Sequence, residues 1–400
     1  MTRDTAKRAG PNHGLDGDLK SRMRAAVASA SANADSVDRD ARFPAEAIEA
    51  LRRERLLGIM VPQELEGERA SLRDVVDICF GLGRACSSTA LIYAMHQIMV
   101  ACVVRHRRDS AWHEELLRRL ASEQLLLASS TTEGQSGGNL RVSAAPIERD
   151  GARIRLERRA TVISYGAHAD AIVTTARRSA DAPPSDQVLV AFLKDDYVLE
   201  PIVAWDTLGM RGTCSAGFTL RASGSSEQIL PEPYETIHVR TMAPTAHLAW
   251  AGVWAGIAAS AVERARSFIR QAARQAGGQP PPGAAHYTKA ARSLRQLRDM
   301  IGATLRRFEA SSSDEARLAS LEFQTMINLT KVDASELAVA AVTSALRACG
   351  LSGYRNDTEF SIGRLLRDIL SSPLMISNDR ILANVANTSL LSAVPDSLHD

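Results

Sequence analysis

The sequence predicts an α+β protein of several domains, with an all-helical N-terminal domain, a middle antiparallel β-domain and a C-terminal four-helix bundle. Three observations lead to this prediction. Apolar residues recur at helical spacing over residues 19–124, short β-branched runs occupy 125–235, and helical spacing returns over 236–400. A chain of 400 residues is also long for a single hydrophobic core. Residues 1–18 have no apolar core and are typical of a flexible tail.

The composition is that of an ordinary soluble globular protein, with 45% hydrophobic residues, 24% charged residues and a net charge of +2. Such a balanced charge gives no indication of binding to nucleic acid or to a membrane surface. The five cysteines show no CxxC pair or metal-ligand spacing, which favours a reduced, cytoplasmic protein without a metal site. We also expect no apolar run to reach the roughly 18 residues that a membrane-spanning helix needs.

Two helices of the N-terminal domain are well marked. Ser71 is a candidate N-cap for a helix over Leu72–Cys86. A second helix starts at Ser87 or Ser88, continues to Arg105 and is apolar nearly all round. A helix without a polar face belongs at the centre of a helical domain, so we expect it there.

The middle of the chain changes to short strand-like runs. They are rich in β-branched residues, are bounded by Gly, Asp, Pro and Ser, and comprise LLLASS, ARIRLE, ATVIS, DAIVTTA, QVLVAFL and GFTLRA. This alternation of short runs and turns predicts an antiparallel β-domain from about Leu125 to Pro233.

Four helical patterns follow the strands. Three extend over about 248–274, 287–310 and 318–349, and a fourth starts near Asn378. The segment GGQPPPGAA at 277–285 separates the first two, because glycine and proline interrupt helices. Four helices in one region predict a bundle.

The stretch from Gly350 to Asn384, GLSGYRNDTEFSIGRLLRDILSSPLMISNDRILAN, links the third and fourth of these helices. It resembles the C-terminal signature of the acyl-CoA dehydrogenase family, which contains a GGxG turn followed by RLLRDA. The matching residues are Gly350, Gly353, Glu359, Arg364, Leu365, Leu366, Arg367 and Asp368. The resemblance implies the acyl-CoA dehydrogenase fold over nearly the whole chain after the tail, and FAD as the cofactor.

Two segments of the β-domain resemble the flavin-binding segments of that family. In Ser130–Asn139, STTEGQSGGN, the resemblance places Thr131, Thr132, Gly137 and Gly138 at the flavin. Threonine hydroxyls and the backbone N–H groups that glycine leaves accessible are suitable donors for flavin carbonyl oxygens and ring nitrogens. A polar, glycine-rich β-turn is the alternative for this segment when it is considered alone.

The second such segment is Thr161–Asp170, TVISYGAHAD. Ile163 matches the family pattern, and Ser164 stands where a family threonine faces the N5 edge of the flavin. Val162 replaces a tryptophan that would lie against the flavin ring, which removes stacking area.

The resemblance also implies that the flavin site is completed across subunits, in a homodimer or homotetramer. Arg347 matches a family glutamine that meets the flavin pyrophosphate of the neighbouring subunit, and Arg274 is the nearest candidate for a second cross-subunit contact. Gly350 opens the glycine turn, and Asn378 stands where a family threonine approaches the adenosine part of FAD.

The family's catalytic glutamate aligns with Ile376, which cannot accept a proton. Asp379 is a candidate for a relocated base, although a residue that starts the last helix is the simpler interpretation. His96 is a lone histidine in the apolar helix and is either a core residue or a catalytic one. Its position matches a histidine near the flavin in monooxygenases of the same superfamily.

Three functions are consistent with these residues. The first, which the breadth of the resemblance favours, is an α,β-dehydrogenase of an acyl thioester, bound to CoA or to a carrier protein, with an electron-transfer flavoprotein as partner. The second is a monooxygenase that takes externally reduced flavin, FAD or FMN, from a flavin reductase and uses O2. The third is a non-catalytic subunit that pairs with an active homologue.

Overall fold

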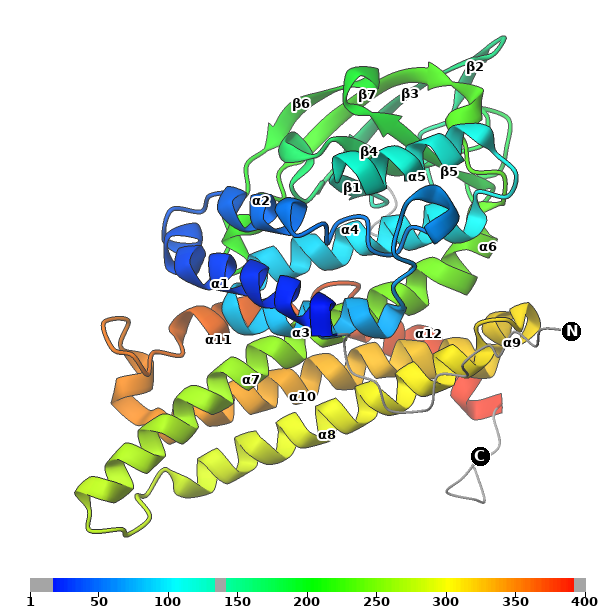
Figure 1. The fold of residues 1–400 in the computed structure, drawn as a ribbon. Coiled ribbons are helices and arrows are strands. Elements are labelled where there is room, and N and C mark those ends of the chain that lie inside the picture. Colours follow the sequence, from blue (N-terminus) through cyan, green and yellow to red (C-terminus); the bar gives the residue numbers. More distant parts are fainter. Residues whose placement is uncertain (1–16, 134–141, 392–400) are drawn as a thin grey trace, which may run out of the picture.

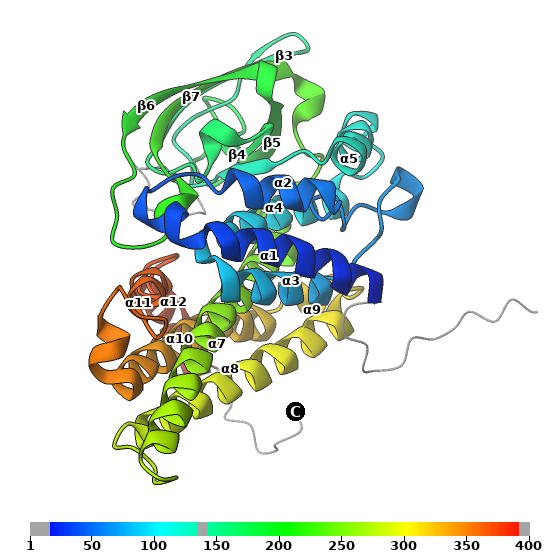
Figure 2. The same ribbon diagram turned by 60° about the vertical axis from the view of Figure 1, so that its left-hand side comes forward.

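The computed structural model describes residues 17–133 and 142–391. Figure 1 shows the β-strands at one end of the molecule, the N-terminal helices in the middle and the long C-terminal helices at the other end. Figure 2, turned by 60°, shows the same three layers. The predicted fold class is therefore confirmed.

The N-terminal layer contains five α-helices among the described residues. They are α1 (Gly17–Arg39), α2 (Ala45–Arg53), α3 (Leu72–Ala85), α4 (Ser87–His106) and α5 (Ala111–Glu123). The predicted cap of α3 is confirmed, because the Ser71 hydroxyl accepts from the Asp74 N–H and the Asp74 carboxylate accepts from the Ser71 N–H. Nearly every residue of α4 is buried, as its apolar sequence predicts.

The β-region forms two sheets from seven strands of the described chain. The strands are β1 (Leu127–Ser130), β2 (Glu148–Asp150), β3 (Arg153–Ala160), β4 (Ala171–Arg177), β5 (Gln187–Leu193), β6 (Tyr197–Val203) and β7 (Gly217–Ser225). The order is β1-β4-β5 in one sheet and β2-β3-β7-β6 in the other. Burial alternates along β3, so one face of that strand packs on the core and the other faces solvent.

One strand pair corrects the expectation of a purely antiparallel β-domain. β1 and β4 are parallel, with Leu127 opposite Ala171, whereas the other strand pairs are antiparallel. The chain leaves β1 and passes through β2 and β3 before it returns as β4. Strand direction depends on this route, which the short β-branched runs do not encode.

The C-terminal layer is built from long helices. They are α6 (Tyr234–Ile237), a π-helical turn (His238–Met242), α7 (Ala243–Gln275), α8 (Ala284–Ser311), α9 (Glu315–Ala319), α10 (Leu321–Tyr354), α11 (Gly363–Ile369) and α12 (Asn378–Leu391). The third predicted helix was expected to end at Cys349. α10 continues to Tyr354, but Gly350 has φ 54° and ψ −135° and breaks its regular geometry at the predicted place.

Glycine allows α3 and α7 to pack closely. A Cβ atom on Gly256 would lie 2.4 Å from the Phe80 carbonyl oxygen, and one on Gly83 would lie 2.5 Å from the Val253 carbonyl oxygen. Since real Cβ atoms do not approach so closely, larger residues would force the two helices apart. The N-terminal layer is thereby set directly on the C-terminal helices.

The RLLRD segment joins all three layers. The Arg367 guanidinium pairs with Asp38 of α1. The Asp368 carboxylate, which is buried, accepts a hydrogen bond of 2.7 Å from the backbone N–H of Met210 in the β-region. A buried carboxylate is stable only with such partners, so this segment fixes the β-region on the helices.

We expected no segment long and apolar enough to span a membrane, and by length and composition alone this expectation is wrong. Three helical segments meet those criteria, namely Ser87–His106, Tyr234–Gln275 and Leu321–Tyr354. In the first two, 89% of the most apolar window is buried inside the protein, and in the third 44% is buried. Burial between layers explains how most of these apolar side chains are accommodated.

Candidate functional site

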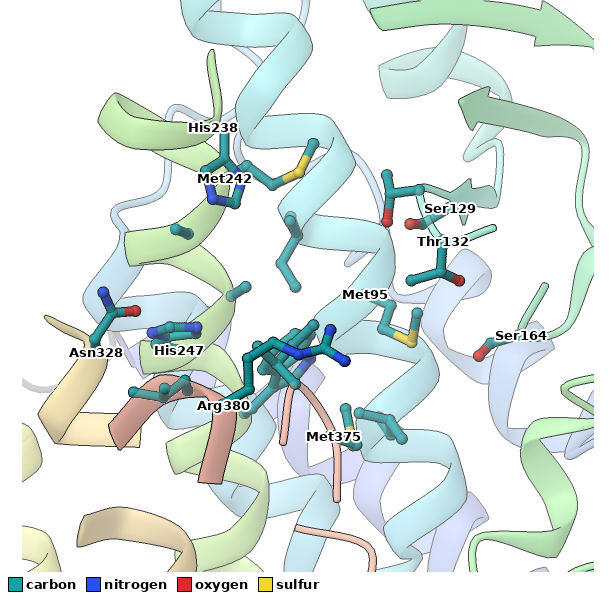
Figure 3. Close-up of a pocket in the computed structure, with 18 of the residues that line it drawn as sticks. Met95, Ser129, Thr132, Ser164, His238, Met242, His247, Asn328, Met375 and Arg380 are labelled. Atoms are coloured by element: carbon teal, nitrogen blue, oxygen red, sulfur yellow. The ribbon is translucent and has the colours of Figure 1, made fainter. Parts of the chain in front are cut away.

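A cavity of about 1000 Å³ lies where the β-region meets the helices. Its walls come from α4, from the loops after β1 and before β7, from the π-helical turn with α7, and from α10 and α12. Figure 3 shows Ser129, Thr132 and Ser164 on one side of this pocket, and His238, His247 and Asn328 on the other. The pocket therefore has a β-domain side and a helical side.

Short hydroxyl side chains line the β-domain side. Five of them are Ser129, Thr131, Thr132, Ser164 and Ser215. The Ser215 hydroxyl donates to the Ser164 oxygen at 2.8 Å and lies 2.7 Å from the Thr213 hydroxyl. These hydroxyl groups form one hydrogen-bonded chain that ends at Ser164 on the pocket wall. The predicted residues Thr131, Thr132 and Ser164 are thus brought together.

Thr131 and Thr132 are held by a buried ion pair just behind them. The Glu133 carboxylate lies 3.1 Å from the Arg158 guanidinium, and both side chains are buried. Glu133 also accepts from the Ser143 hydroxyl at 2.8 Å and from the Ala144 N–H at 2.7 Å. One carboxylate therefore anchors the chain on both sides of residues 134–141. The predicted Gly137 and Gly138 lie outside the described residues.

Other predicted cofactor residues lie away from the cavity wall. Ile163 is fully buried and its N–H donates to the Ala216 carbonyl, so it supports the Ser164 backbone rather than lining the pocket. Arg274 is exposed in the last turn of α7, and Arg347 is exposed on α10. Gly350 is exposed at the break in α10. The single chain does not bring these last three to the pocket.

Both ring nitrogens of His96 are engaged by backbone groups. Nδ1 accepts from the Leu127 N–H at 3.0 Å, and Nε2 donates to the Leu57 carbonyl at 2.9 Å. The ring is fully buried, which lowers its pKa to about 4. His96 does not line the cavity. Its position is that of a core residue that ties α4 to the start of β1, and a catalytic role for it stays a prediction.

Asp379 also lies outside the cavity lining. It is exposed in the first turn of α12, where its negative charge interacts favourably with the positive end of the helix dipole. This placement agrees with the simpler interpretation of Asp379 as a residue that starts the last helix.

Ile376 lines the pocket in an unusual backbone conformation. Its φ is 46°, a left-handed value that β-branched residues rarely adopt. Its carbonyl oxygen accepts from Nζ of Lys331 at 3.1 Å. The same Nζ donates to Oδ1 of Asn378 at 2.7 Å and lies 5.6 Å from the centroid of the Trp254 ring. Asn378, predicted at the cofactor, here orients the lysine that holds Ile376.

Lys331 is fully buried, and burial lowers its pKa to about 8. The Asn378 amide completes the cluster by donating to the Ser335 hydroxyl at 2.9 Å. These polar contacts stabilise the buried ammonium group. They also hold the backbone of Ile376 in its left-handed conformation, which the residue would otherwise rarely adopt.

The helical side of the pocket carries polar groups that sequence reasoning did not select. They are His238, His247, Gln324, Thr325, Asn328, Arg380 and Asn384. In Figure 3 the side chain of Arg380 points into the space between the two sides. A signal was available, because Leu321, Gln324, Thr325 and Asn328 have the spacing of one helix face. The sequence pattern within α10 does not indicate that this face lies opposite α7 and α12.

Methionines form much of the apolar wall between the two sides. Met95, Met99, Met210, Met242 and Met375 line the cavity, which is five of the ten methionines in the chain. Met242 and His238 both come from the π-helical turn. Such turns occur often at functional sites because they change which side chains face inward.

No carboxylate lines this cavity in the described part of the chain. The segment 134–141, GQSGGNLR, contains no aspartate or glutamate in its sequence. Among the described lining residues, the ionisable side chains are two histidines, His238 and His247, and Arg380.

Comparison with known proteins gives the family. A model of the acyl-CoA dehydrogenase N-terminal domain matches residues 18–124, and a model of the acyl-CoA dehydrogenase C-terminal domain matches residues 242–388. Together these matches cover more than half of the chain. This protein belongs to the acyl-CoA dehydrogenase family. The resemblance inferred from its motifs is confirmed, and with it membership of a superfamily of flavin-dependent oxidoreductases.

Similar members of the superfamily have different activities. L-evernosamine nitrososynthase from a Micromonospora species is 27% identical over 373 residues, which are 86% of this chain and 83% of that protein. Cyclohex-1-ene-1-carbonyl-CoA dehydrogenase from Geobacter metallireducens is 24% identical over 362 residues, 89% of this chain and 92% of that protein. FMN-bound TdsC from Paenibacillus sp. A11-2, a dibenzothiophene monooxygenase, superimposes with a TM-score of 0.82 at 19% identity, over 96% of this chain and 100% of that chain.

The residues of this family member fit a flavin. The hydroxyl-lined side offers short donors, and a flavin ring presents carbonyl oxygens and nitrogens that accept such bonds. Val162 and Trp205 supply apolar surface on the same side. The five hydroxyl residues would hold the ring edges, and bound flavin would supply two-electron redox chemistry.

Proposed function

We propose that this protein is a flavin-dependent monooxygenase that oxidises a small organic substrate with O2 and externally reduced flavin. The observation that carries this proposal is the lack of any aspartate or glutamate among the described residues that line the cavity. Dehydrogenation of an acyl thioester requires a base to remove the α-proton, and a carboxylate is suited to that role. Oxygenation needs no such base.

The reaction balances with the reactants named. One atom of O2 enters the substrate, the other leaves as water, and the two electrons come from the reduced flavin, which is oxidised. The contribution of the chain is to orient the flavin through hydroxyl groups, to place the substrate against it and to exclude water with an apolar wall. The methionine-rich lining is suited to the last task.

The similar proteins support this assignment. The nitrososynthase and the dibenzothiophene monooxygenase both carry out oxidations other than α,β-dehydrogenation, and the latter is described with FMN. Arg274 and Arg347, the residues expected at the flavin pyrophosphate, are exposed and do not line the pocket of their own chain. FMN or FAD delivered by a flavin reductase is therefore the cofactor that we propose.

A second candidate is dehydrogenation of an acyl thioester. It is favoured by the similarity to cyclohex-1-ene-1-carbonyl-CoA dehydrogenase. His247 lines the pocket and would be the base in that case. Burial and neighbouring cations lower its pKa to about 3, which makes it a weak base. The geometry therefore supports this candidate less well.

The two candidates differ in what reduces the flavin. The purified protein would be loaded with FAD or FMN and mixed anaerobically with a panel of acyl-CoA thioesters while the flavin absorbance is recorded. Separately, it would receive NADH, a flavin reductase, aromatic substrates and ¹⁸O2, with products analysed by mass spectrometry. We expect no bleaching by thioesters and one ¹⁸O atom in the product. Bleaching by a thioester without added reductant would overturn the monooxygenase assignment.

A further inference from the structure

His247 presents a hydrogen-bond acceptor to the pocket. Its Nδ1 lies 3.2 Å from the carbonyl oxygen of Ile327. A carbonyl oxygen only accepts, so Nδ1 carries the proton and Nε2 keeps its lone pair. The ring lines the cavity, and Figure 3 shows it projecting from α7 toward the space beside Arg380.

The surroundings keep this imidazole neutral. It is buried, with 5% of its surface exposed, and the charges of Lys331 and His238 oppose its protonation. Burial is the largest cause of its pKa of about 3. Since no carboxylate lines the described cavity to offset a positive charge, a cationic ligand group finds no partner there. A neutral donor, N–H or O–H, is the group that fits Nε2.

The wall beside His247 is suited to an aromatic ring. The Trp250 ring lies 5.9 Å from the His247 ring, centroid to centroid, and lines the cavity. Figure 3 shows Met242 on the same side of the pocket as His247, and Met95 and Met375 nearer to Ser164. Thioether sulfur makes favourable contacts with aromatic rings, of about 0.3–1.5 kcal/mol each, and methionine adapts its shape to the ligand.

We propose that the substrate is an aromatic compound that carries a neutral N–H or O–H group, and that His247 binds this group through Nε2. This assignment rests on the proposed monooxygenase function and names its substrate class. Bound in this way, the ring lies along the methionine-rich wall between His247 and the hydroxyl groups of the β-domain. His247 is then a residue that selects and orients the substrate, and the flavin-facing hydroxyls are on the opposite side.

The test uses two probes of nearly equal shape. Indole has a ring N–H, and benzofuran has an oxygen in its place. Their dissociation constants would be measured by isothermal titration calorimetry on the flavin-loaded, oxidised protein, without turnover. We expect indole to bind about tenfold more tightly, which corresponds to about 1.4 kcal/mol and to one hydrogen bond.

Three variants assign the preference to His247. His247→Phe keeps an aromatic ring but has no acceptor, so the two probes should bind with about equal dissociation constants. His247→Gln restores an acceptor oxygen and should recover part of it. His286→Phe replaces a histidine that does not line the pocket, and should leave the preference unchanged. Thermal unfolding of each variant would verify that it is folded.

Two results would overturn the assignment. One is an indole preference that survives in His247→Phe, and the other is failure of the wild-type protein to prefer indole or to bind either probe. Failure of the monooxygenase function is distinguishable, because ¹⁸O incorporation would then be absent while the His247-dependent binding preference persists.

Discussion

At the scale of single residues, two buried basic side chains control the backbone around the pocket. His96 joins Leu57 to Leu127, and Lys331 joins Ile376 to Asn378. Neither side chain lines the cavity. Both act through the residues they position, because a buried backbone group that loses its partner raises the free energy of the folded state.

Replacing His96 should test its structural role. His96→Leu removes the acceptor of the buried Leu127 N–H, whereas the Leu57 carbonyl keeps the Gln97 amide at 3.0 Å, so we expect a loss of about 1–3 kcal/mol in the free energy of unfolding. His96→Gln keeps one donor and one acceptor and should lose less. Urea denaturation at pH 7 measures both. If His96→Leu kept wild-type stability but abolished turnover, the catalytic interpretation of His96 would be restored.

His96 also predicts acid sensitivity. Its folded-state pKa of about 4 lies below the ordinary value of 6.5, so the unfolded chain takes up the proton first as the pH falls. The stabilisation is present above pH 6.5 and is lost as the pH falls through 4, by about 3 kcal/mol in total. Comparing denaturation of wild type and His96→Gln from pH 7 to pH 4 isolates this contribution. Parallel curves would contradict it.

Lys331 predicts a change of stability at alkaline pH. Its folded-state pKa of about 8 lies below the ordinary 10.5, so between these values the unfolded chain holds more protons and stability rises with pH. The rise should reach about 3 kcal/mol relative to Lys331→Met, which does not titrate. Denaturation of both proteins from pH 7.5 to pH 10.5 measures it. A constant difference between them would show that Lys331 does not titrate in this range.

At the scale of secondary-structure elements, glycine sets the distance between α3 and α7. Gly256→Ala would place a Cβ atom 2.4 Å from the Phe80 carbonyl oxygen. We expect this variant to lose about 1–3 kcal/mol of stability, measured by urea denaturation. Gly302→Ala on α8 is the matched control, because its nearest neighbour is the flexible Arg306 side chain at 3.6 Å. The control should gain about 0.5–1 kcal/mol from helix propensity. Equal changes of stability at both sites would contradict this prediction and would mean that α3 and α7 can move apart at little cost in free energy.

At the scale of the whole molecule, the positions of Arg274 and Arg347 suggest a site completed by a second copy. Both are exposed and absent from the pocket of their own chain. They lie at one end of the bundle, since Gly283 in the α7–α8 connection packs on the Ala348 carbonyl. Three large apolar side chains near the same signature region are also exposed, namely Leu351, Tyr354 and Leu374, at 71%, 76% and 77%.

We therefore predict that the protein sediments as a dimer or tetramer and that Arg347→Glu weakens flavin binding about tenfold, the effect of losing one charged phosphate contact. Sedimentation velocity and flavin fluorescence titration measure the two properties. Arg306→Glu, on the neighbouring helix α8 and outside the motif, is the control. A monomeric protein whose flavin affinity is unchanged by Arg347→Glu would exclude the cross-subunit site.

Local features of this protein were predictable because short-range interactions decide them. The cap at Ser71 depends on residues three positions apart, and the break at Gly350 depends on the backbone freedom of one glycine. The burial of α4 follows from its lack of a polar face. Thr131, Thr132 and Ser164 were predicted from short motifs, and the structure places all three in the lining of one pocket.

By itself the sequence determined the order of the helical, β and helical regions and the family, and it selected Thr131, Thr132 and Ser164 as candidate site residues, since helical periodicity, strand runs and spaced motifs are local properties. Only the tertiary structure decided that β1 and β4 are parallel, that both nitrogens of His96 are occupied by backbone and that Asp379 faces solvent. It also brought His247, Asn328 and Arg380 together from three helices. Such contacts depend on how layers pack over long sequence separations, and no residue pattern within one helix specifies its partner.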